Sequence, residues 1–513
     1  MSILSSVVLQ KLDQKLECKD AAISKHSRLS RQQLRDQVIK CAAELREIGI
    51  YERTAVLLNL VSSVESLIAF LAVLETRAVP VLVPPNLGQR ELKHIAKQID
   101  CFWAIVSSSL NRKISSMQIT DQTVIVSPGQ YENVYEIQLS CSDFSFQRKT
   151  AFDVADDTVF FLLSGGTTGF PKLIPRTHRD YLINIFSSAK IAEVSSNSKY
   201  LCALPMMHNF ALGCPGVLGI LSNGGTVVFP SSQSNASLIE SIICEGITHT
   251  AVVPGIALEI AKQAGHNLKV LQVGGARLFN QQAEAVQQSL LSGKLQQVYG
   301  MAEGLLNFTR LDDSFDVITK TQGRPMLPDD EVQLLTTDEN DLVKRVPPTV
   351  NAVGELLTRG PCTITGYYNC PQANETSFTD DGLYRSGDIV RVDKSGNFIV
   401  IGRTSEWINK GGEKISIIEL EELIIRHSSI VEVAVAPIPD SYYGEKIGVF
   451  IVSQEDKLIK LRDIRKFLRN LKISSYKLPD LLFILEEIPK TPVGKIDRQA
   501  LASYTAPNIK DLR

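Results

Sequence analysis

The sequence predicts an α/β protein, with a large N-terminal α/β body of several subdomains and a small α+β C-terminal lid domain. One observation is an alternation of short apolar runs with amphipathic segments, as in TAVLLNL, SVESLIAFLAVLETRA and VPVLVPP between Thr54 and Pro85. Such an alternation is typical of βα units and a largely parallel sheet. It recurs in THTAVVPG followed by IALEIAKQ, and in LKVLQVGG followed by a helical segment ending near Leu291. The other observation is a change of pattern near Gly402, where this alternation ends.

The segment after Gly402 has the composition of a separate small domain. SIIELEELIIRH begins at Ser416 and carries Glu419 three residues later, a capping box that predicts a helix start. Two strand-like runs, a second amphipathic helix and a further strand follow: VEVAVAPI, KIGVFIVS, KLRDIRKFLRNL and LLFILEEI. This is enough chain for an independent domain. We therefore expect a body over residues 1–402 and a lid domain over residues 403–513.

Composition narrows the function classes. The chain has 513 residues and a formal net charge of −2, so no excess of positive charge indicates a nucleic-acid or membrane partner. The apolar run LIAFLAVL is bounded by Glu65 and Glu75 and is too short to cross a bilayer. The N-terminal segment lacks the features of a signal peptide. Nine cysteines without any CxxC pair favour reduced thiols. We expect a cytoplasmic enzyme without a structural metal.

A glycine-rich stretch, SGGTTGFPK, directly follows the apolar run TVFFLL. Its spacing differs from that of a Walker A loop, which excludes the usual P-loop assignment. A glycine-rich turn after a buried strand can present backbone N–H groups to an anion, and Thr167, Thr168 and Lys172 would add hydroxyls and a positive charge. The stretch therefore predicts a phosphate-binding loop, with an ordinary surface loop as the alternative.

Five further stretches accompany this loop in order along the chain. They are GGA (Gly274–Ala276), YGMAEG (Tyr299–Gly304), YRSGD (Tyr384–Asp388), NKGGEK (Asn409–Lys414) and TPVGKIDR (Thr491–Arg498). Together with SGGTTGFPK they resemble the core motifs of the adenylate-forming superfamily, which includes acyl-CoA synthetases, nonribosomal peptide adenylation domains and beetle luciferases. The longer segments LSGGTTGFPKLIPRTHRDY, PMMHNFALGCPGVLG and QQVYGMAEGLLNFTRLDD look like those of stand-alone aryl-AMP ligases of siderophore biosynthesis. Such enzymes activate salicylate or 2,3-dihydroxybenzoate.

The resemblance implies ATP-dependent adenylation of an aromatic acid, with Mg²⁺, release of pyrophosphate and transfer of the acyl group to a thiol. Catalysis of this reaction is mainly positioning and neutralisation of charge. Lys495 would bridge the substrate carboxylate and the α-phosphate when the lid closes, and its alternative is a solvated surface charge. Glu303 would bind Mg²⁺, with a solvated carboxylate at a helix start as its alternative. His178 would lie near the substrate carboxylate, with a structural core histidine as its alternative.

The nucleotide contacts implied by the resemblance come from several motifs. Asp388 and Arg403 would bind the ribose hydroxyls, although Asp388 could instead cap local backbone and Arg403 could form an interdomain salt bridge. Tyr299 would stack on adenine, with core packing as its alternative. The full set that we expect to contact ATP or AMP is Ser164, Gly165, Gly166, Thr167, Thr168, Gly169, Lys172, Gly275, Ala276, Val298, Tyr299, Gly300, Met301, Ala302, Asp388 and Arg403.

The resemblance also implies an aryl-acid pocket. Asn209 stands where amino-acid-activating relatives carry an aspartate, which argues against an α-amino acid, and it would contact the 2-hydroxyl of the substrate. Cys214 and Leu306 stand where dihydroxybenzoate enzymes usually carry serine and valine. A thiol is a weak partner for a 3-hydroxyl, so the pair favours salicylate, with 2,3-dihydroxybenzoate as the alternative. The expected pocket residues are His208, Asn209, Phe210, Cys214, Gly274 and Leu306.

Transfer to a thiol requires a path for the acceptor. Gly411, Gly412 and Lys414 would line the path of a phosphopantetheine arm, and Ser405 occupies the hinge position where relatives often carry aspartate or lysine. A basic run on the lid favours an acidic aryl carrier protein over free coenzyme A, and its residues are Arg462, Arg465, Arg469 and Lys472.

Three other function classes are less well supported. A kinase or P-loop ATPase would need motifs that the sequence lacks. The aryl pocket around Asn209 does not favour a luciferase-like oxidative reaction. A non-enzymatic relative would be expected to lose Lys495 or Glu303, and both are present.

Overall fold

The computed structural model describes residues 3–10, 14–110, 122–128, 135–139, 157–164, 170–337, 343–404, 407–410, 413–440, 442–454, 459–471, 473–490 and 496–503. The chain divides into two compact units. The first comprises Met1–Glu331 and Thr358–Tyr384, and the second comprises Val332–Leu357 and Arg385–Arg513.

The first unit contains a seven-stranded sheet in the order β7-β6-β5-β3-β4-β8-β9. Its inner strands pair in parallel, and the edge strands β7 and β9 pair antiparallel. The strands are β3 (Ala55–Asn59), β4 (Val79–Leu82), β5 (Trp103–Ser107), β6 (Gln122–Pro128), β7 (Tyr135–Leu139), β8 (Thr158–Leu163) and β9 (Leu173–Thr177). The helices before the last two strands are α1 (Ile3–Val8), α2 (Gln14–Glu17), α3 (Arg31–Glu47), α4 (Val64–Glu75) and α5 (Gln89–Gln98), with the short 3₁₀ helix η1 (Ser108–Leu110) after β5.

A nine-stranded sheet of the same unit has the order β16-β15-β14-β13-β12-β10-β11-β1-β2. The central strands β10 to β14 are parallel along the sheet, and β15 returns antiparallel to β14. Its strands are β1 (Asp20–Ile23), β2 (Arg28–Ser30), β10 (Lys199–Leu201), β11 (Thr226–Val228), β12 (His249–Val252), β13 (Val270–Gly274), β14 (Lys294–Gly300), β15 (Leu306–Phe308) and β16 (Arg324–Pro325).

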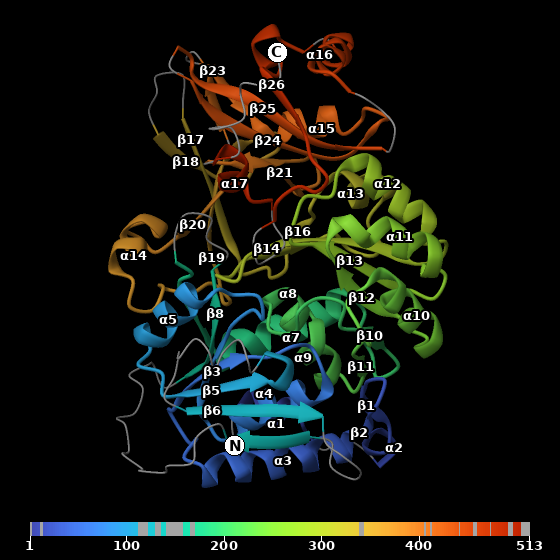
Figure 1. Ribbon diagram of the computed structural model, residues 1–513, viewed down its shortest axis with the longest axis vertical. Helices are drawn as coiled ribbons and strands as arrows, with labels where there is room; N and C mark the ends of the chain where they lie inside the picture. Colours follow the sequence, from blue (N-terminus) through green and yellow to red (C-terminus); the bar gives the residue numbers. More distant parts are fainter. Residues whose placement is uncertain are drawn as a thin grey trace. The chain divides into compact units, whose positions relative to one another are not determined.

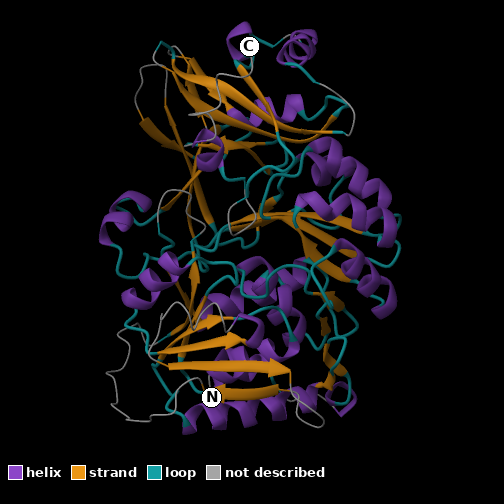
Figure 2. Ribbon diagram, viewed as in Figure 1, coloured by secondary structure: helices purple, strands orange, loops and turns teal. Residues whose placement is uncertain are grey.

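Helices flank this second sheet, as Figures 1 and 2 show. A hydrophobic core joins β12 and β13 to three successive helices, α10 (Asn235–Glu245), α11 (Pro254–Ala264) and α12 (Asn280–Ser289). The remaining helices of the unit are α7 (His178–Ile191), α8 (Asn209–Gly213), α9 (Gly216–Ser222), α13 (Phe315–Lys320) and α14 (Pro371–Ser377).

The second unit is built on two five-stranded sheets. One has the strand order β18-β17-β19-β20-β21. The other has the strand order β23-β22-β25-β24, and its fifth strand, β26, also pairs with β25. The strands are β17 (Glu331–Thr337), β18 (Val343–Val346), β19 (Val353–Arg359), β20 (Tyr384–Val392), β21 (Phe398–Arg403), β22 (Trp407–Lys410), β23 (Glu413–Ser416), β24 (Ile430–Asp440), β25 (Gly444–Ser453) and β26 (Leu481–Ile484). The helices are α15 (Ile417–Ile424), α16 (Leu461–Asn470) and α17 (Arg498–Ser503), with the 3₁₀ helix η2 (Ser475–Lys477).

The structure confirms the predicted α/β class and the α+β character of the C-terminal segment. The apolar run in α4 is explained by burial, since every residue of that helix is buried, and a helix that is apolar all round belongs in a core. Among the described residues, no helix combines the length and apolar character needed to cross a membrane. The boundary expected between residues 402 and 403 falls at the end of β21, inside the second unit, and stays a prediction.

The start of α15 differs in one detail from the expected capping box. Ser416 accepts a hydrogen bond from the backbone N–H of Glu419, as expected for an N-cap. The Glu419 carboxylate instead accepts the Lys477 ammonium, with both oxygens at 2.7 Å. A charged partner from a distant segment has replaced the local backbone contact.

Candidate active site

The glycine-rich loop is closed at its base by two hydrogen bonds. The backbone N–H of Ser164 donates to the Lys172 carbonyl at 3.0 Å, and the Lys172 N–H donates to Ser164 Oγ at 2.9 Å. These contacts continue the antiparallel pairing of β8 with β9. Gly165, Gly166, Thr167, Thr168 and Gly169 lie outside the described residues. The sheet therefore fixes where the loop starts and ends. The hydroxyl oxygen of Ser164 accepts a hydrogen bond from the backbone at the end of the loop.

Tyr367 connects three of the predicted motifs. Its hydroxyl donates to Glu303 Oε1 at 2.8 Å and lies 3.1 Å from the hydroxyl of Tyr384, while Lys172 Nζ lies 4.3 Å from its ring centroid. Burial, followed by the negative charge of Glu303, raises the pKa of Tyr367, so the phenol keeps its proton and acts as a donor. The sequence reasoning missed this residue, which belongs to none of the motifs and lies 17 positions before Tyr384.

The two nucleotide segments GGA and YGMAEG lie at the ends of adjacent parallel strands. Gly274 at the end of β13 pairs with Val298 in β14, which places Gly275 and Ala276 beside the segment that starts at Tyr299. Gly275 has a φ of +79°, a left-handed conformation that glycine adopts without strain. The carboxyl end of a parallel sheet is a common place for a ligand. The structure thus brings these predicted nucleotide residues together.

Gly300 allows β14 to turn sharply into β15. A Cβ at this position would lie 2.4 Å from Leu306 Cδ2 and 2.7 Å from the Leu305 carbonyl oxygen. The Met301 N–H donates to that Leu305 carbonyl at 3.1 Å and closes the turn. The turn carries Glu303, which is 8% exposed. The tight connection therefore holds Glu303 and Leu306 close to the end of the sheet.

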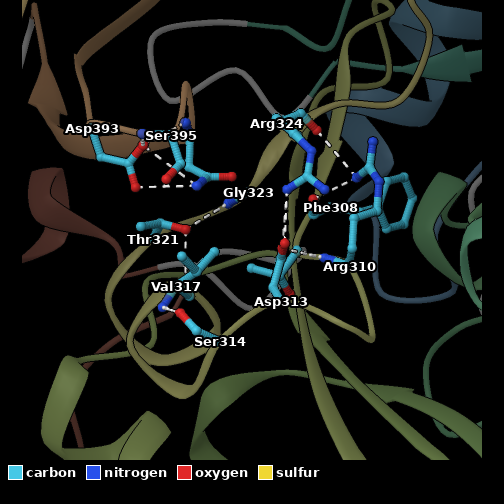
Figure 3. Close-up of polar contacts among 12 residues, drawn as sticks. Phe308, Arg310, Asp313, Ser314, Val317, Thr321, Gly323, Arg324, Asp393 and Ser395 are labelled. Carbon is cyan, nitrogen blue, oxygen red and sulfur yellow. Dashed lines mark hydrogen bonds and ion pairs between the residues drawn. The ribbon is translucent and has the colours of Figure 1, made fainter. Parts of the chain in front are cut away.

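A cluster of charged residues holds the chain after β15. Figure 3 shows Arg324 directed at Asp313, with its Nη1 2.9 Å from Asp313 Oδ1, while the backbone N of Arg310 lies 2.6 Å from Asp313 Oδ2. Arg310 Nη1 also donates to the Phe308 carbonyl at 2.6 Å. This cluster fixes the strand that carries Leu306.

Arg176 is fully buried and was missed by the sequence reasoning. Its Nε donates to Asp180 Oδ1 at 3.1 Å, and its Nη1 donates to the carbonyl of Ala302 at 2.9 Å. Its Nη2 lies 3.4 Å from the Cys362 carbonyl oxygen. The arginine ties β9 and α7 to the YGMAEG segment. Its one sequence signal was the i,i+4 spacing to an aspartate in PRTHRDY.

Asn209 lies at the start of α8 and is buried, with 7% of its surface exposed. Tyr181 Oη, from α7, donates to Asn209 Oδ1 at 3.0 Å. Asn209 Nδ2 lies 3.9 Å from Cys214 Sγ, and that thiol donates to the Asn209 carbonyl at 3.5 Å. Burial raises the pKa of Cys214 to about 12, so the thiol is neutral. Asn209 and Cys214, both predicted pocket residues, are therefore in direct contact.

Phe210 connects α8 to the end of β13. A Cβ at Gly274 would lie 3.2 Å from two atoms of the Phe210 ring and 2.5 Å from the Val298 carbonyl oxygen. The backbone carbonyl therefore restricts this position to glycine, and the Phe210 ring packs closely against it. Leu306 belongs to the same hydrophobic core as Phe210 and Cys214. Five of the six predicted pocket residues are thus buried in one region.

The two predicted histidines have structural contacts. His208 is exposed and serves as the N-cap of α8, where its Nδ1 accepts from the Phe210 backbone N–H at 3.3 Å. His178 begins α7, and its Nδ1 accepts from the Leu4 backbone N–H at 3.3 Å. Burial lowers the pKa of His178, which favours the neutral ring. Its expected contact with the substrate carboxylate stays a prediction.

In the second unit, Asp388 and Arg403 face each other across β20 and β21. Arg403 Nε lies 2.7 Å from Asp388 Oδ1, and Asp388 is 4% exposed. The Asp388 backbone N–H donates to Ser386 Oγ at 3.0 Å. The structure therefore brings the two predicted ribose residues together within one unit, as an ion pair.

Several predicted residues lie outside the described part of the chain: Lys495, Ser405, Gly411 and Gly412. The backbone of Lys414 is described, and it pairs with Asn409 in the β22–β23 hairpin. Arg465 on α16 donates from Nε to the Pro479 carbonyl at 2.7 Å, whereas the side chain of Arg462 is 78% exposed. Lys472 is not described.

Residues 11–368 match the family described as AMP-binding enzyme, and residues 419–495 match the AMP-binding enzyme C-terminal domain. The chain belongs to the AMP-binding enzyme family. The second match ends at Lys495, the residue that the motif pattern singles out in the C-terminal segment.

Three curated members of the family are similar over almost the whole chain. A salicylyl-CoA synthase / salicylate adenylyltransferase from Streptomyces sp. is 38% identical, covering 94% of this chain and 90% of that protein. A 2,3-dihydroxybenzoate-AMP ligase from Bacillus subtilis is 37% identical, covering 90% and 86%. A salicyl-AMP ligase / salicyl-S-ArCP synthetase from Mycobacterium tuberculosis is 36% identical, covering 93% and 85%.

A solved structure of the family, apo MbtA from Mycobacterium smegmatis, covers 98% of this chain and 94% of its own. It has 34% sequence identity and a TM-score of 0.66 to this chain. The predicted membership of the adenylate-forming superfamily is confirmed.

Proposed function

We propose that this AMP-binding enzyme activates an aromatic carboxylic acid, salicylate, with ATP. A carboxylate oxygen forms a bond to the α-phosphorus, the bond from that phosphorus to the bridging oxygen breaks, and pyrophosphate leaves. The thiol of a phosphopantetheine arm on an aryl carrier protein then takes the acyl group, AMP leaves, and the thioester enters siderophore assembly. The observation that carries the proposal is the buried amide of Asn209 beside Cys214, at the carboxyl end of a parallel sheet.

The chain supplies the groups that such a reaction needs. Lys172 stands at the end of the glycine-rich loop and is suited to outer phosphates. Asp388, a carboxylate with acceptors only, is suited to the ribose hydroxyls, and it forms an ion pair with Arg403. Lys495 would bring a positive charge between the carboxylate and the α-phosphate, two anions that otherwise repel each other.

Mg²⁺ fits the donor set around Glu303. Within the described ranges, no group of three or more His, Cys, Asp or Glu side chains could hold a metal ion alone. Mg²⁺ is commonly bound by one or two carboxylates together with substrate phosphates and water. Glu303 has one oxygen engaged by Tyr367, which orients the other for a cation. When bound, Mg²⁺ would neutralise phosphate charge, and Glu303 would be its protein ligand.

Salicylate is favoured over 2,3-dihydroxybenzoate by the state of Cys214. Its single proton is donated to the Asn209 carbonyl, so the thiol has no donor left for a 3-hydroxyl, and sulfur is a weak acceptor. A buried hydroxyl without a good partner costs about 1–3 kcal/mol. The curated relatives named above include enzymes for each acid, and 2,3-dihydroxybenzoate is the second candidate.

A carrier protein is favoured as the acceptor by the basic side chains of α16, of which Arg462 and Arg469 are exposed. Carrier proteins commonly present an acidic helix, and opposite charges speed such an encounter. The names of the similar proteins include both a coenzyme A product and a carrier-protein product. Free coenzyme A is therefore the second candidate acceptor.

ATP–pyrophosphate exchange with salicylate, 2,3-dihydroxybenzoate and benzoate tests the first half-reaction. We expect kcat/KM for salicylate to exceed that for 2,3-dihydroxybenzoate by about 5- to 150-fold, the range that a lost buried hydrogen bond allows. A preference for 2,3-dihydroxybenzoate would reject salicylate, and no exchange with any aromatic acid would reject the proposed function. Thioester formation with an aryl carrier protein or coenzyme A then identifies the acceptor.

A further inference from the structure

The hydroxyl of Tyr181 has no role in the reaction proposed above, yet it contacts the amide that would bind the substrate. Tyr181 is fully buried, and its Oη lies 3.0 Å from Asn209 Oδ1. Burial raises the pKa of Tyr181 well above its ordinary value, so the phenol keeps its proton. A protonated phenol next to an amide oxygen is a hydrogen-bond donor to that oxygen.

This contact fixes which end of the Asn209 amide faces away from Tyr181. The oxygen and nitrogen of the amide point in different directions, so an oxygen held by Tyr181 turns the NH₂ group towards Cys214 Sγ, at 3.9 Å. With the amide reversed, Oδ1 would face a sulfur whose proton is already donated to the Asn209 carbonyl. Two acceptors would then meet. The reversed orientation would also leave the Tyr181 O–H without the acceptor that Asn209 Oδ1 provides.

The tyrosine ring is held in place on several sides. The ring of Phe160 contacts it edge-on at 4.6 Å between centroids, and the Arg176 guanidinium lies 5.2 Å from its centroid. Gly213 leaves space for the hydroxyl, since a Cβ there would lie 2.5 Å from Tyr181 Oη. The hydroxyl therefore cannot move aside without repacking a dense core.

We propose that Tyr181 is a positioning residue that makes the aryl pocket offer only N–H donors to the ortho substituent of the acid. This inference rests on the proposed function, and it adds a selection rule to it. The pocket accepts an ortho group with an outward lone pair and rejects an ortho group with an outward N–H.

Salicylate and anthranilate differ in this property. The hydroxyl of salicylate donates its proton to its own carboxylate, which leaves oxygen lone pairs for an N–H of Asn209. The amine of anthranilate uses one N–H in the same way, but its second N–H points outward and its lone pair is delocalised into the ring. Anthranilate would thus bring a donor against a donor. An unsatisfied buried polar group corresponds to about 5- to 150-fold in selectivity.

The wild-type enzyme provides the first test, by ATP–pyrophosphate exchange with salicylate, anthranilate and benzoate. Benzoate has no ortho group and serves as the reference. We expect kcat/KM for salicylate to lie above that for benzoate and kcat/KM for anthranilate to lie below it. Anthranilate at or above the value for benzoate overturns the selection rule, whereas no exchange with any of the three acids overturns the proposed function and this inference together.

Tyr181→Phe provides the second test, because it keeps the ring and removes only the donor. The Asn209 amide is then able to rotate and present its oxygen, so the salicylate-to-anthranilate ratio should fall by about 10-fold or more. A general loss of activity affects all three acids alike and cancels in the ratio. A ratio equal to that of the wild type overturns the assignment to Tyr181.

Two further variants separate positioning from packing. Gly213→Ala places a Cβ 2.5 Å from the same hydroxyl, which must shift, and it should lower the ratio in the same direction. This variant keeps the test available if Tyr181→Phe folds poorly. Tyr200→Phe is the matched control: Tyr200 is also fully buried, and its hydroxyl has no hydrogen-bond partner among the described residues. Its ratio should equal the wild-type ratio, and an equal fall in Tyr200→Phe overturns the inference.

Discussion

The proposed aryl pocket and helix α16 hold their polar side chains in opposite ways. In this pocket and the core beside it, Tyr181, Asn209 and Arg176 are buried, and each has hydrogen-bond partners on other segments. On α16, the Arg462 side chain is 78% exposed, and its nearest carboxylate, Asp463, is 3.8 Å away. A buried polar group without its partner costs far more than a solvated one. The polar groups of the pocket are therefore held in defined positions, whereas α16 contributes mainly net positive charge.

The largest effect should come from Arg176→Met. This variant tests whether the buried polar residues need their hydrogen-bond partners for the protein to be stable. The change leaves the carboxylate of Asp180 and the carbonyl of Ala302 without their buried donor. We expect the free energy of unfolding to fall by about 3–5 kcal/mol, measured by chemical denaturation. Arg179→Met is the matched control, since Arg179 is exposed on α7, the helix that carries Asp180, and it should change stability by less than about 0.5 kcal/mol. Equal effects of the two variants would show that burial of the guanidinium does not matter.

Lys495→Ala tests the motif of the C-terminal segment. Loss of one charge that stabilises a transition state typically lowers kcat by about 10²- to 10³-fold. We expect this fall in adenylate formation, while thioester formation from supplied adenylate should change much less. Lys490→Ala is the control, because Lys490 is partly exposed and lies 3.5 Å from Glu432. Full-speed adenylation in Lys495→Ala would contradict the assigned role.

His249, another buried polar residue, should make the stability of the protein depend on pH. Its Nε2 contacts the Ala192 carbonyl at 3.0 Å, and burial lowers its pKa to about 4. The unfolded chain takes up a proton near the ordinary value of about 6.5, so this contribution to stability is complete above that pH and is lost as the pH falls towards 4. We expect a loss on the order of 2–3 kcal/mol between pH 7 and 4, reduced in His249→Gln.

The difference between wild type and His249→Gln is the quantity to measure, by thermal or urea unfolding at each pH. Asp330 acts in the opposite direction, because burial raises its pKa to about 6 and its contribution is lost as the pH rises from about 4 to 6. That contribution is common to both proteins and cancels. A difference that does not vary with pH would exclude His249 as the source.

The smallest effect is expected on α16. The double variant Arg462→Glu/Arg469→Glu should lower kcat/KM for the carrier protein by about 3- to 10-fold relative to pyrophosphate exchange, because it reverses charges that attract the partner. The effect should weaken as salt rises from about 0.05 to 0.5 M. Free pantetheine is the control acceptor and should be insensitive. A loss that salt does not reduce, or one shared by pantetheine, would remove α16 as the docking surface.

Local signals predicted the elements well because their causes are local. Alternation and helical periodicity located β3, α4, β12, α11 and β13, and Ser416 was correctly placed at the start of α15. The exception is the Glu419 carboxylate, whose partner Lys477 lies 58 positions away. Periodicity and capping depend on neighbours within a few residues, and no such rule names a distant partner.

By itself, the sequence determined the α/β class, the family and most candidate residues, since those depend on local patterns and on motifs in order along the chain. Only the tertiary structure decided the contacts that orient them. Tyr181 meets Asn209 across 28 positions, Tyr367 meets Glu303 across 64, and Arg176 reaches Ala302 across 126. Such pairs form where packing brings separate segments together and water is excluded, so a buried donor takes the acceptor that the fold places beside it.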